Sequence, residues 1–302
     1  MGAPLDDPER AQRLVALVLD WWGGVRAERD ALPWRSTRDP WAVLVAETML
    51  AQTQVRRVAE RYPAFLERFP TPRACATAPL GELLRAWSGL GYNRRAAQLR
   101  EAAQAILGRH GGAVPGGLAE LLALPGVGPY TARAVRAFAL GEDEAVLDTN
   151  VGRVLARALA GRPLGRAEAQ ASADALVPPG GARRWSLALM DFGSLCCSAR
   201  APSCASCPLG RDRVCAWRTL GTPEDPARGS AGVTTRQARF AGSDREGRGR
   251  LVRAACGGPI PPGALPALAG WPEDPERAAR VAADLVAEGL LAVRADGSLV
   301  LP

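Results

Sequence analysis

The sequence predicts an all-α protein that ends in a small C-terminal α+β module. Apolar residues recur at helical spacing through most of the first 220 positions, and Pro and Gly separate these stretches at short intervals. No alternating strand pattern occurs before residue 290. With 302 residues and 47% hydrophobic content, the chain can form two or three domains with cores of their own.

The first predicted helix covers residues 10–28 and places its large apolar side chains on one side. A Leu-Pro-Trp-Arg turn follows at residues 32–35. Asp39 and Pro40 then begin a second helix, Asp39 as its cap and Pro40 in its first turn. Further helices are predicted over residues 56–68, 79–87, 94–109, 117–123, 129–140 and 183–195.

The second predicted helix carries an unusual charge. Glu47 is the only charged residue between Trp41 and Val55. A carboxylate on a mostly apolar helix costs free energy unless it is paired or used. Apolar neighbours would raise its pKa, which suits an acid that works at neutral pH. A Glu on the solvent edge of an amphipathic helix is the alternative, and this stretch alone does not separate the two.

A Leu-Pro-Gly-Val-Gly turn at residues 124–128 joins two predicted helices. Its glycines allow a tight turn and leave backbone N–H groups open at a helix start, which suits a DNA phosphate. A plain αα-hairpin explains the same pattern. Asp148 lies 20 residues beyond Gly128, where an apolar stretch meets the next helix, and it is also a predicted helix N-cap that would stay ionised there.

Four of the seven cysteines fall within 19 residues, in the pattern Cys197-x6-Cys204-x2-Cys207-x7-Cys215. The chain has neither an apolar run of about 20 residues nor a signal-peptide pattern, so we expect a cytoplasmic protein. Metal binding is then favoured over disulfides. One close pair and two distant single cysteines, without His, favour an iron–sulfur cluster over structural zinc.

The basic residues are all of one kind. The net charge is +7, and all 38 basic residues are Arg. This charge suits DNA phosphate contacts, although an ordinary solvated surface explains it equally well. Without Lys, no side-chain Schiff base can form. The single His, His110, lies beside two glycines and is interpreted as a structural loop residue.

The C-terminal part is a separate small unit. Residues 218–245 are rich in Gly, Pro, Ser and Thr and are predicted to be a linker. Helices are predicted over residues 246–256 and 274–289, followed by a hairpin around Asp296 and Gly297. This order indicates a winged-helix-like module at 246–302, a type that binds either nucleic acid or other proteins.

Taken together, these features resemble the helix-hairpin-helix DNA glycosylases with an iron–sulfur cluster, the endonuclease III superfamily. The motifs at residues 32–35, 47–54 (ETMLAQTQ) and 87–92 (WSGLGY) are similar to those of adenine DNA glycosylases of the MutY type. The resemblance covers about residues 10–217. It implies a six-helix domain at 32–142 with the helix-hairpin-helix, and an iron–sulfur cluster domain formed by 1–31 and 143–217.

The resemblance also implies residue roles. Glu47 would protonate the adenine ring and then handle water, Asp148 would stabilise the sugar cation, and Asn150 would support Asp148. Tyr130 stands where members that also cut the backbone carry Lys, which predicts a monofunctional enzyme; it would contact the sugar or Asp148. The implied DNA-binding residues are Arg35, Gln52, Thr53, Tyr92, Gly126, Val127 and Gly128, with Gln52 and Tyr92 entering the duplex. The implied ligands of a [4Fe-4S] cluster are Cys197, Cys204, Cys207 and Cys215.

The expected activity is excision of adenine mispaired with 8-oxoguanine or guanine, after the base is flipped out of double-stranded DNA. The expected protein is a monomer, nucleoid-associated in a bacterial cytoplasm. The sequence departs from the family in three places: Ala51 replaces a Gln, the last cysteine gap is seven residues rather than five, and no MutT-like domain is recognisable. A glycosylase for T:G or U:G mispairs, and a non-catalytic DNA-binding protein, are the alternatives.

Overall fold

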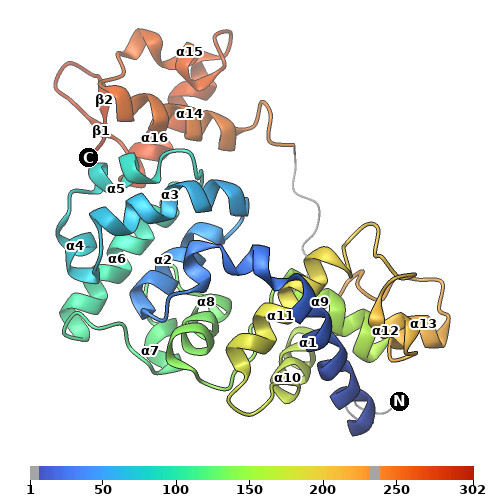
Figure 1. Cartoon of the computed structure of the whole chain (residues 1–302). Coiled ribbons are helices and arrows are strands. Elements are labelled where there is room, and N and C mark those ends of the chain that lie inside the picture. The colour runs from blue at the N-terminus through green and yellow to red at the C-terminus, as the bar shows by residue number, and fades with distance from the viewer. Residues whose placement is uncertain (1–6, 232–238) are drawn as a thin grey trace. The chain divides into compact units, whose positions relative to one another are not determined.

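A computed structural model describes residues 7–231 and 239–302 and is largely helical (Figure 1). The chain forms two compact units. Unit 1 comprises Met1–Pro40 and Pro129–Arg236, and unit 2 comprises Trp41–Gly128 and Gln237–Pro302. Residues 1–6 and residues 232–238 of the predicted linker lie outside the described residues. Across the described ranges, none of the helices combines the length and hydrophobicity that crossing a membrane requires.

Unit 1 is built around two long helices, α1 (Pro8–Asp30) and α11 (Ala182–Leu195). Asp7 caps α1 by accepting a hydrogen bond from the Arg10 amide, and Leu14, Val18 and Trp22 enter the core, as the sequence predicts. The remaining helices of unit 1 are η1 (Pro33–Arg35), α8 (Pro129–Val135), η2 (Arg136–Leu140), α9 (Thr149–Val154), η3 (Leu155–Ala160), α10 (Arg166–Ala175), α12 (Pro208–Arg211) and α13 (Ala216–Leu220).

Unit 2 contains α2 (Pro40–Leu50), which is buried on nearly all sides, including Trp41, Leu44 and Met49. A helix that is apolar all round belongs in a core, which explains its low amphipathicity. The other elements are α3 (Val55–Arg68), α4 (Pro72–Thr77), α5 (Leu80–Trp87), α6 (Arg94–Arg109), α7 (Leu118–Leu122), α14 (Asp244–Gly257), η4 (Pro262–Ala264), α15 (Leu265–Ala269), α16 (Pro275–Ala287), β1 (Ala292–Val293) and β2 (Leu299–Val300).

The C-terminal module packs against α5 within unit 2. The amide of Gly81 donates a hydrogen bond of 3.1 Å to the carbonyl of Pro302. A Cβ at Gly81 would lie 2.7 Å from that carbonyl oxygen, so only Gly permits the approach. On the same side, the Cys256 thiol of α14 lies 3.9 Å from the Leu84 carbonyl.

The predicted C-terminal hairpin is present. β1 and β2 pair antiparallel, with Ala292 opposite Val300. The bridge between Ile260 and Leu299 adds a third strand position, which the sequence did not predict because a single paired residue has no periodicity. The helices α14, α15 and α16 with a small sheet confirm the α+β character of the module.

Other differences concern short elements. The helices α4, α10, α12, α13 and α15 were not predicted, and all of these except α10 span only one or two turns. The predicted helix over 129–140 is α8 followed by the π-helical turn η2. Part of the predicted linker is packed rather than free: Asp225 pairs with Arg157 at 2.6 Å, and Ser230 is buried.

Candidate catalytic and DNA-binding site

Glu47 lies inside unit 2. It occupies the last third of α2 and is 5% exposed, so the alternative of a solvated helix edge is wrong. Val43, Leu44 and Met49 of the same helix are buried with it. The sequence thus builds a buried carboxylate by placing one Glu in a helix with no other charge. Such a group is costly to bury and is a candidate for chemistry rather than solubility.

The residues expected to enter the duplex share an uncommon backbone conformation. Gln52 has a φ of 60° and Tyr92 a φ of 48°. Among the described residues, only one other non-glycine residue, Arg213, has a positive φ. Left-handed backbone costs a bulky L-residue about 1 kcal/mol or more, and it persists only where the surroundings enforce it. Residues held in this way cluster at functional sites, which makes both loops candidates for DNA contact.

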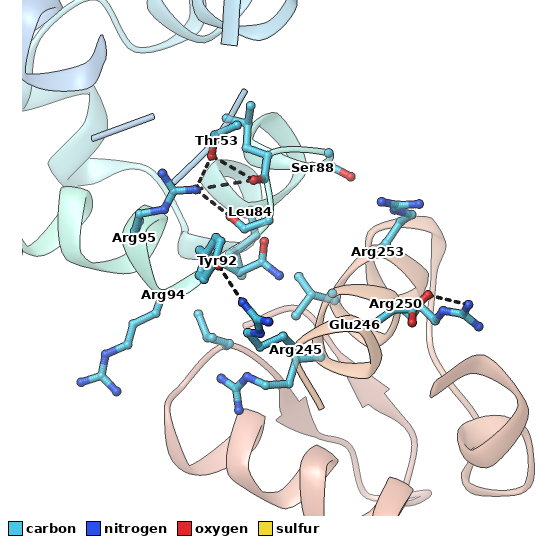
Figure 2. Close-up of a pocket in the computed structure, with 18 of the residues that line it drawn as sticks. Thr53, Leu84, Ser88, Tyr92, Arg94, Arg95, Arg245, Glu246, Arg250 and Arg253 are labelled. Atoms are coloured by element: carbon cyan, nitrogen blue, oxygen red, sulfur yellow. Dashed lines mark hydrogen bonds and ion pairs between the residues drawn. The ribbon is translucent and has the colours of Figure 1, made fainter. Parts of the chain in front are cut away.

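Arg95, on the first turn of α6, holds these two loops together. Its guanidinium donates to the carbonyl of Ala51 at 2.5 Å and to the Thr53 hydroxyl at 2.8 Å, on either side of Gln52. It also donates to the carbonyl of Gly91 at 3.2 Å, just before Tyr92. The Thr53 hydroxyl in turn donates to the Leu90 carbonyl at 3.3 Å. Thr53, which the resemblance implies in DNA binding, thus links its own loop to the loop that carries Tyr92 (Figure 2).

Arg95 also stacks on aromatic rings. Its guanidinium carbon lies 5.4 Å from the ring centre of Trp87 and 5.3 Å from that of Tyr92. Burial lowers the pKa of Arg95 to about 10, so the group remains charged at neutral pH. The sequence did not single out Arg95, since its neighbour Arg94 is chemically identical. The sequence feature that could have indicated Arg95 is its position three residues after Tyr92, which is about one helical turn.

The Leu-Pro-Gly-Val-Gly turn forms as expected. The Val127 amide donates to the Leu124 carbonyl at 3.1 Å, which closes the turn. Gly126 has a φ of 73°, and a Cβ there would lie 2.8 Å from Cβ of Gln98. Gly126 therefore needs to be Gly on two grounds. Gly128 has open space around its α-carbon, and α8 begins at the next residue. Phosphate binding by residues 126–128 stays a prediction.

Asp148 lies inside unit 1, at the start of α9. Its carboxylate accepts hydrogen bonds from the Val151 amide at 2.7 Å and from the Asn150 side chain at 2.8 Å. This confirms the predicted N-cap. Arg153 donates to the other end of the Asn150 amide at 2.8 Å, which fixes its orientation. Asn150 thus contacts Asp148 directly, and its supporting role in catalysis stays a prediction.

The electrostatic setting of Asp148 differs from the expectation. A helix start was expected to keep this carboxyl readily ionised. Instead, burial raises the pKa of Asp148, and the hydrogen bonds from Val151 and Asn150 only oppose that shift. The reason is that the hydrogen bonds from Val151 and Asn150 compensate for only part of the water that the carboxylate loses. Sequence patterns at a helix N-terminus carry no information on tertiary burial.

The other predicted residues have distinct settings. Tyr130 lies half-buried on the first turn of α8, in the same unit as Asp148.

Arg35 makes a two-pronged ion pair with Asp191, both distances being 2.7 Å, and Trp22 donates to the same carboxylate at 2.9 Å. The Arg35 side chain is only 8% exposed, so in this structure its charge serves the core of unit 1. A DNA-binding role for Arg35 stays a prediction.

The four predicted cysteine ligands line one pocket in unit 1, together with Cys196. Cys207 is the N-cap of α12 and Cys215 the N-cap of α13. A hydrogen bond from Cys196 lowers the pKa of Cys207 to about 6, and Arg157 lies 3.5 Å from Sγ of Cys197. Within the described ranges, no three Cys, His, Asp or Glu side chains are close enough to hold a single metal ion.

Comparisons with known proteins identify the family. Residues 45–179 match the HhH-GPD superfamily of base excision DNA repair proteins. The chain is 40% identical to an adenine DNA glycosylase of Mycobacterium tuberculosis over 94% of its own length and 92% of the relative's. The chain belongs to this family of DNA repair glycosylases, and within it to the MutY type. A second adenine DNA glycosylase, from Mycolicibacterium smegmatis, is also 40% identical and covers 94% of both chains.

Other relatives in this glycosylase family cover less of the chain. A thymine-DNA glycosylase of Aeropyrum pernix is 37% identical over 67% of this chain. The solved structure of a thermostable thymine-DNA glycosylase aligns with a TM-score of 0.65 and 30% identity, over 70% of this chain and 98% of that one. A trapped endonuclease III–DNA covalent intermediate aligns with a TM-score of 0.59 and 26% identity, over 70% of this chain and 98% of that one. The helical body is thus shared widely among glycosylases, and the fold predicted from the sequence is confirmed.

Proposed function

We propose that this DNA glycosylase removes adenine mispaired with 8-oxoguanine or guanine and does not cut the DNA backbone. The observation that carries the proposal is the presence of two carboxylates with different surroundings. Glu47 is buried on an otherwise uncharged helix, whereas Asp148 accepts two hydrogen bonds at a helix start. Breaking a glycosidic bond needs one acid and one ionised carboxylate, and this pair can supply both.

The proposed chemistry proceeds after the target adenine has been flipped out of the duplex. Glu47 donates its proton to the adenine ring, so that the base leaves as a neutral molecule when the bond to the sugar breaks. The ionised carboxylate of Asp148 stabilises the cation left on the sugar, and Asn150 holds that carboxylate in place. Water then adds to the sugar carbon and gives its proton to the Glu47 carboxylate, which restores the acid.

The choice of base is supported by how far the relatives extend. Both mycobacterial relatives named adenine DNA glycosylase match about 94% of this chain, which includes much of the C-terminal module. The thymine-DNA glycosylase matches only 67%. Excision at T:G or U:G mispairs is the second candidate, since that relative shares the helical body at 37% identity.

A panel of excision assays tests this proposal. We expect release of adenine from A:8-oxoG and A:G duplexes and little release of thymine or uracil from T:G and U:G duplexes. Glu47→Gln should lower the excision rate by about 100-fold or more, as loss of a general acid typically does. Glu101→Gln, an exposed acid on α6, is the matched control and should act like the parent enzyme. Efficient release of thymine instead of adenine would contradict the proposal.

The proposal that the enzyme does not cleave the DNA strand follows from the amino-acid composition of the chain. The sequence contains no Lys, and Tyr130 occupies the position where lysine-dependent members of the family carry their nucleophile. We expect no efficient covalent adduct with abasic DNA under borohydride. A strong adduct would show that another amine performs the step.

The cysteine pocket fits a [4Fe-4S] cluster. Four thiols around one pocket match the number and kind of ligands that such a cluster takes. The spacing of one close pair and two distant single cysteines, without His, favours such a cluster over structural zinc. When bound, the cluster would brace the chain after α11. A brown protein whose iron is lost in Cys204→Ala but kept in Cys256→Ala would support this assignment. The monomeric state and cytoplasmic location stay predictions.

A further inference from the structure

The chain stays packed on unit 1 for some distance after the last of the four cysteines. Residues 222–231, which we call the post-cysteine segment, belong to that unit. Ala227 and Ser230 are each 4% exposed. The Ser230 hydroxyl accepts a hydrogen bond from the Leu164 amide at 3.2 Å, and the Ala231 amide donates to the Leu164 carbonyl at 2.9 Å. A flexible tether would make no such contacts, so this segment has a defined place in the fold.

Asp225 makes the central contact of the post-cysteine segment. Its carboxylate accepts hydrogen bonds from Nε of Arg157 at 2.8 Å and from a terminal nitrogen of the same guanidinium at 2.6 Å. The Ala227 amide donates to this carboxylate at 3.0 Å and fixes its orientation. The hydrogen bonds from Arg157 hold the pKa of Asp225 below its ordinary value, so the carboxylate is ionised at neutral pH. A two-pronged pair of this kind fixes both the position and the direction of the guanidinium.

The other donors of Arg157 face the first of the four cysteines. This side chain is 1% exposed and projects from η3. Its second terminal nitrogen donates to the Ser198 carbonyl at 2.7 Å and lies 3.3 Å from the Cys197 carbonyl and 3.5 Å from the Cys197 sulfur. Arg157 therefore holds the turn that begins at Cys197. A buried guanidinium costs free energy unless a carboxylate offsets its charge, so this arrangement depends on Asp225.

The post-cysteine segment also supports a second residue of the cysteine pocket. Arg157 and Trp217 both line that pocket, and the guanidinium carbon lies 5.3 Å from the ring centre of Trp217. The indole N–H of Trp217 donates to the Thr222 carbonyl at 3.0 Å. Two residues of the pocket wall are thus each hydrogen-bonded to this segment.

These contacts distinguish two roles for the segment. A segment that only led the chain away from unit 1 would need no ion pair with a residue that touches a cysteine sulfur. Groups that hold the ligands of a metal centre in place, without touching the metal, change metal affinity by about 10- to 100-fold. Hydrogen bonds to the ligand sulfurs also influence how readily an iron–sulfur cluster is oxidised. The contacts of Asp225 fit a supporting role of this kind.

We propose that the post-cysteine segment retains the iron–sulfur cluster, with Asp225 as the positioning residue for Arg157. This inference rests on the proposed assignment of a cluster to the four cysteines. Asp225 holds the guanidinium of Arg157 against Cys197, and Arg157 in turn holds the turn that carries this ligand. The part of the chain that retains iron therefore extends past Cys215 to residues that the cysteine pattern does not include.

The test follows the loss of iron from the full-length protein, purified with its iron, in ferricyanide and EDTA. Visible absorbance and released iron give the rate, at a temperature where a thermal melt shows that every variant is folded. Asp225→Asn should lose iron about tenfold faster than the parent. Asp225→Glu keeps the carboxylate and should stay within about threefold of the parent rate. Glu224→Gln, a change at the exposed neighbouring acid, is the matched control and should behave like the parent.

A double-mutant cycle separates positioning from general stabilisation of the fold. Since Asp225 acts through Arg157, adding Asp225→Asn to Arg157→Lys should accelerate iron loss by no more than about twofold. Fully additive effects, or an Asp225→Asn protein that loses iron at the parent rate, would overturn the inference alone. A parent protein that holds no iron would refute the cluster assignment and the inference together. Adenine excision by the parent is assayed separately, so failure of the proposed activity would be seen independently.

Discussion

At the scale of single residues, this glycosylase uses burial to give two carboxylates unusual properties. Glu47 is buried because its whole helix is apolar, and Asp148 is partly buried where α9 begins. Burying a carboxylate costs folding free energy unless hydrogen bonds or charges replace the water that it loses. Replacing such a residue should therefore raise stability while it lowers activity.

Asp148→Asn tests this trade-off. Asn also caps helices well, so the contact with the Val151 amide is retained. The pKa of Asp148 is higher in the folded protein than its ordinary value of 3.8. The free energy of unfolding of the wild type therefore falls as the pH rises from about 3.8 through the pKa of the folded state. The Asp148→Asn variant does not ionise at this position, so it should melt a few degrees higher than the wild type at pH 7.5. Its rate of adenine excision should nevertheless fall by about 100-fold or more. The difference in melting temperature should shrink toward pH 4.

A variant that melted lower than wild type at pH 7.5, or a difference that did not depend on pH, would show that the Asp148 carboxylate stabilises the fold.

Arg95 is the second residue whose role depends on geometry. Arg95→Lys keeps the charge but cannot reach both loops, because an ammonium lacks the planar fork. We expect a tenfold or greater fall in excision rate with a smaller loss of stability. Fluorescence of 2-aminopurine placed beside the mispair should also show weaker disturbance of the stack, a change that a purely structural role would not produce. Arg109→Lys, an exposed change at the other end of α6, is the control.

At the scale of elements, the close packing of α9 against α11 positions Asp148. Gly193 of α11 lies so near Asn150 that an added Cβ would be 2.7 Å from the Asn150 Cβ and 2.8 Å from its carbonyl oxygen. Both neighbours are held by α9, so neither can yield without moving that helix. The position of Asn150, and with it that of Asp148, therefore depends on the absence of a side chain at Gly193.

Gly193→Ala should push α9 away from α11. Overpacking of this kind costs about 1–3 kcal/mol of unfolding free energy. Because Asn150 moves with α9, excision should fall by about tenfold or more at a temperature where the variant is fully folded. Gly23→Ala on α1 is the control: nothing lies within 4 Å of the added Cβ, and a helical Gly to Ala change stabilises by up to about 1 kcal/mol. Equal behaviour of the two variants would contradict this account.

At the scale of the whole molecule, every basic side chain is Arg. The net charge of +7 is carried by groups that stay protonated at any physiological pH and that amine reagents do not attack. Any ion pair that a side chain of this protein makes with a DNA phosphate is therefore made by a guanidinium group.

Chemical modification makes that test. An amine-acylating reagent can react only at the N-terminus, and we expect unchanged affinity for duplex DNA. An arginine-selective dicarbonyl should weaken binding about 100-fold or more and flatten its salt dependence, because phosphate contacts are removed. Bound duplex should protect against the loss. A fall in affinity after acylation would assign DNA contact to the N-terminus instead.

The sequence by itself determined the helical class, the C-terminal hairpin, the N-cap at Asp148 and the turn at Gly126. These follow from local rules, since periodicity, capping and a positive φ depend on residues a few positions apart. The motifs likewise sufficed for the family, because Glu47, the hairpin and the four cysteines occur in one order along the chain.

Only the tertiary structure decided the rest. The raised pKa of Asp148, the bridging role of Arg95 and the ion pair that occupies Arg35 all depend on residues distant in sequence. The hydrogen bond between Tyr92 and Arg245 is the clearest example, since these residues are 153 positions apart. Local patterns cannot encode such contacts, because burial and electrostatics arise from which elements pack together.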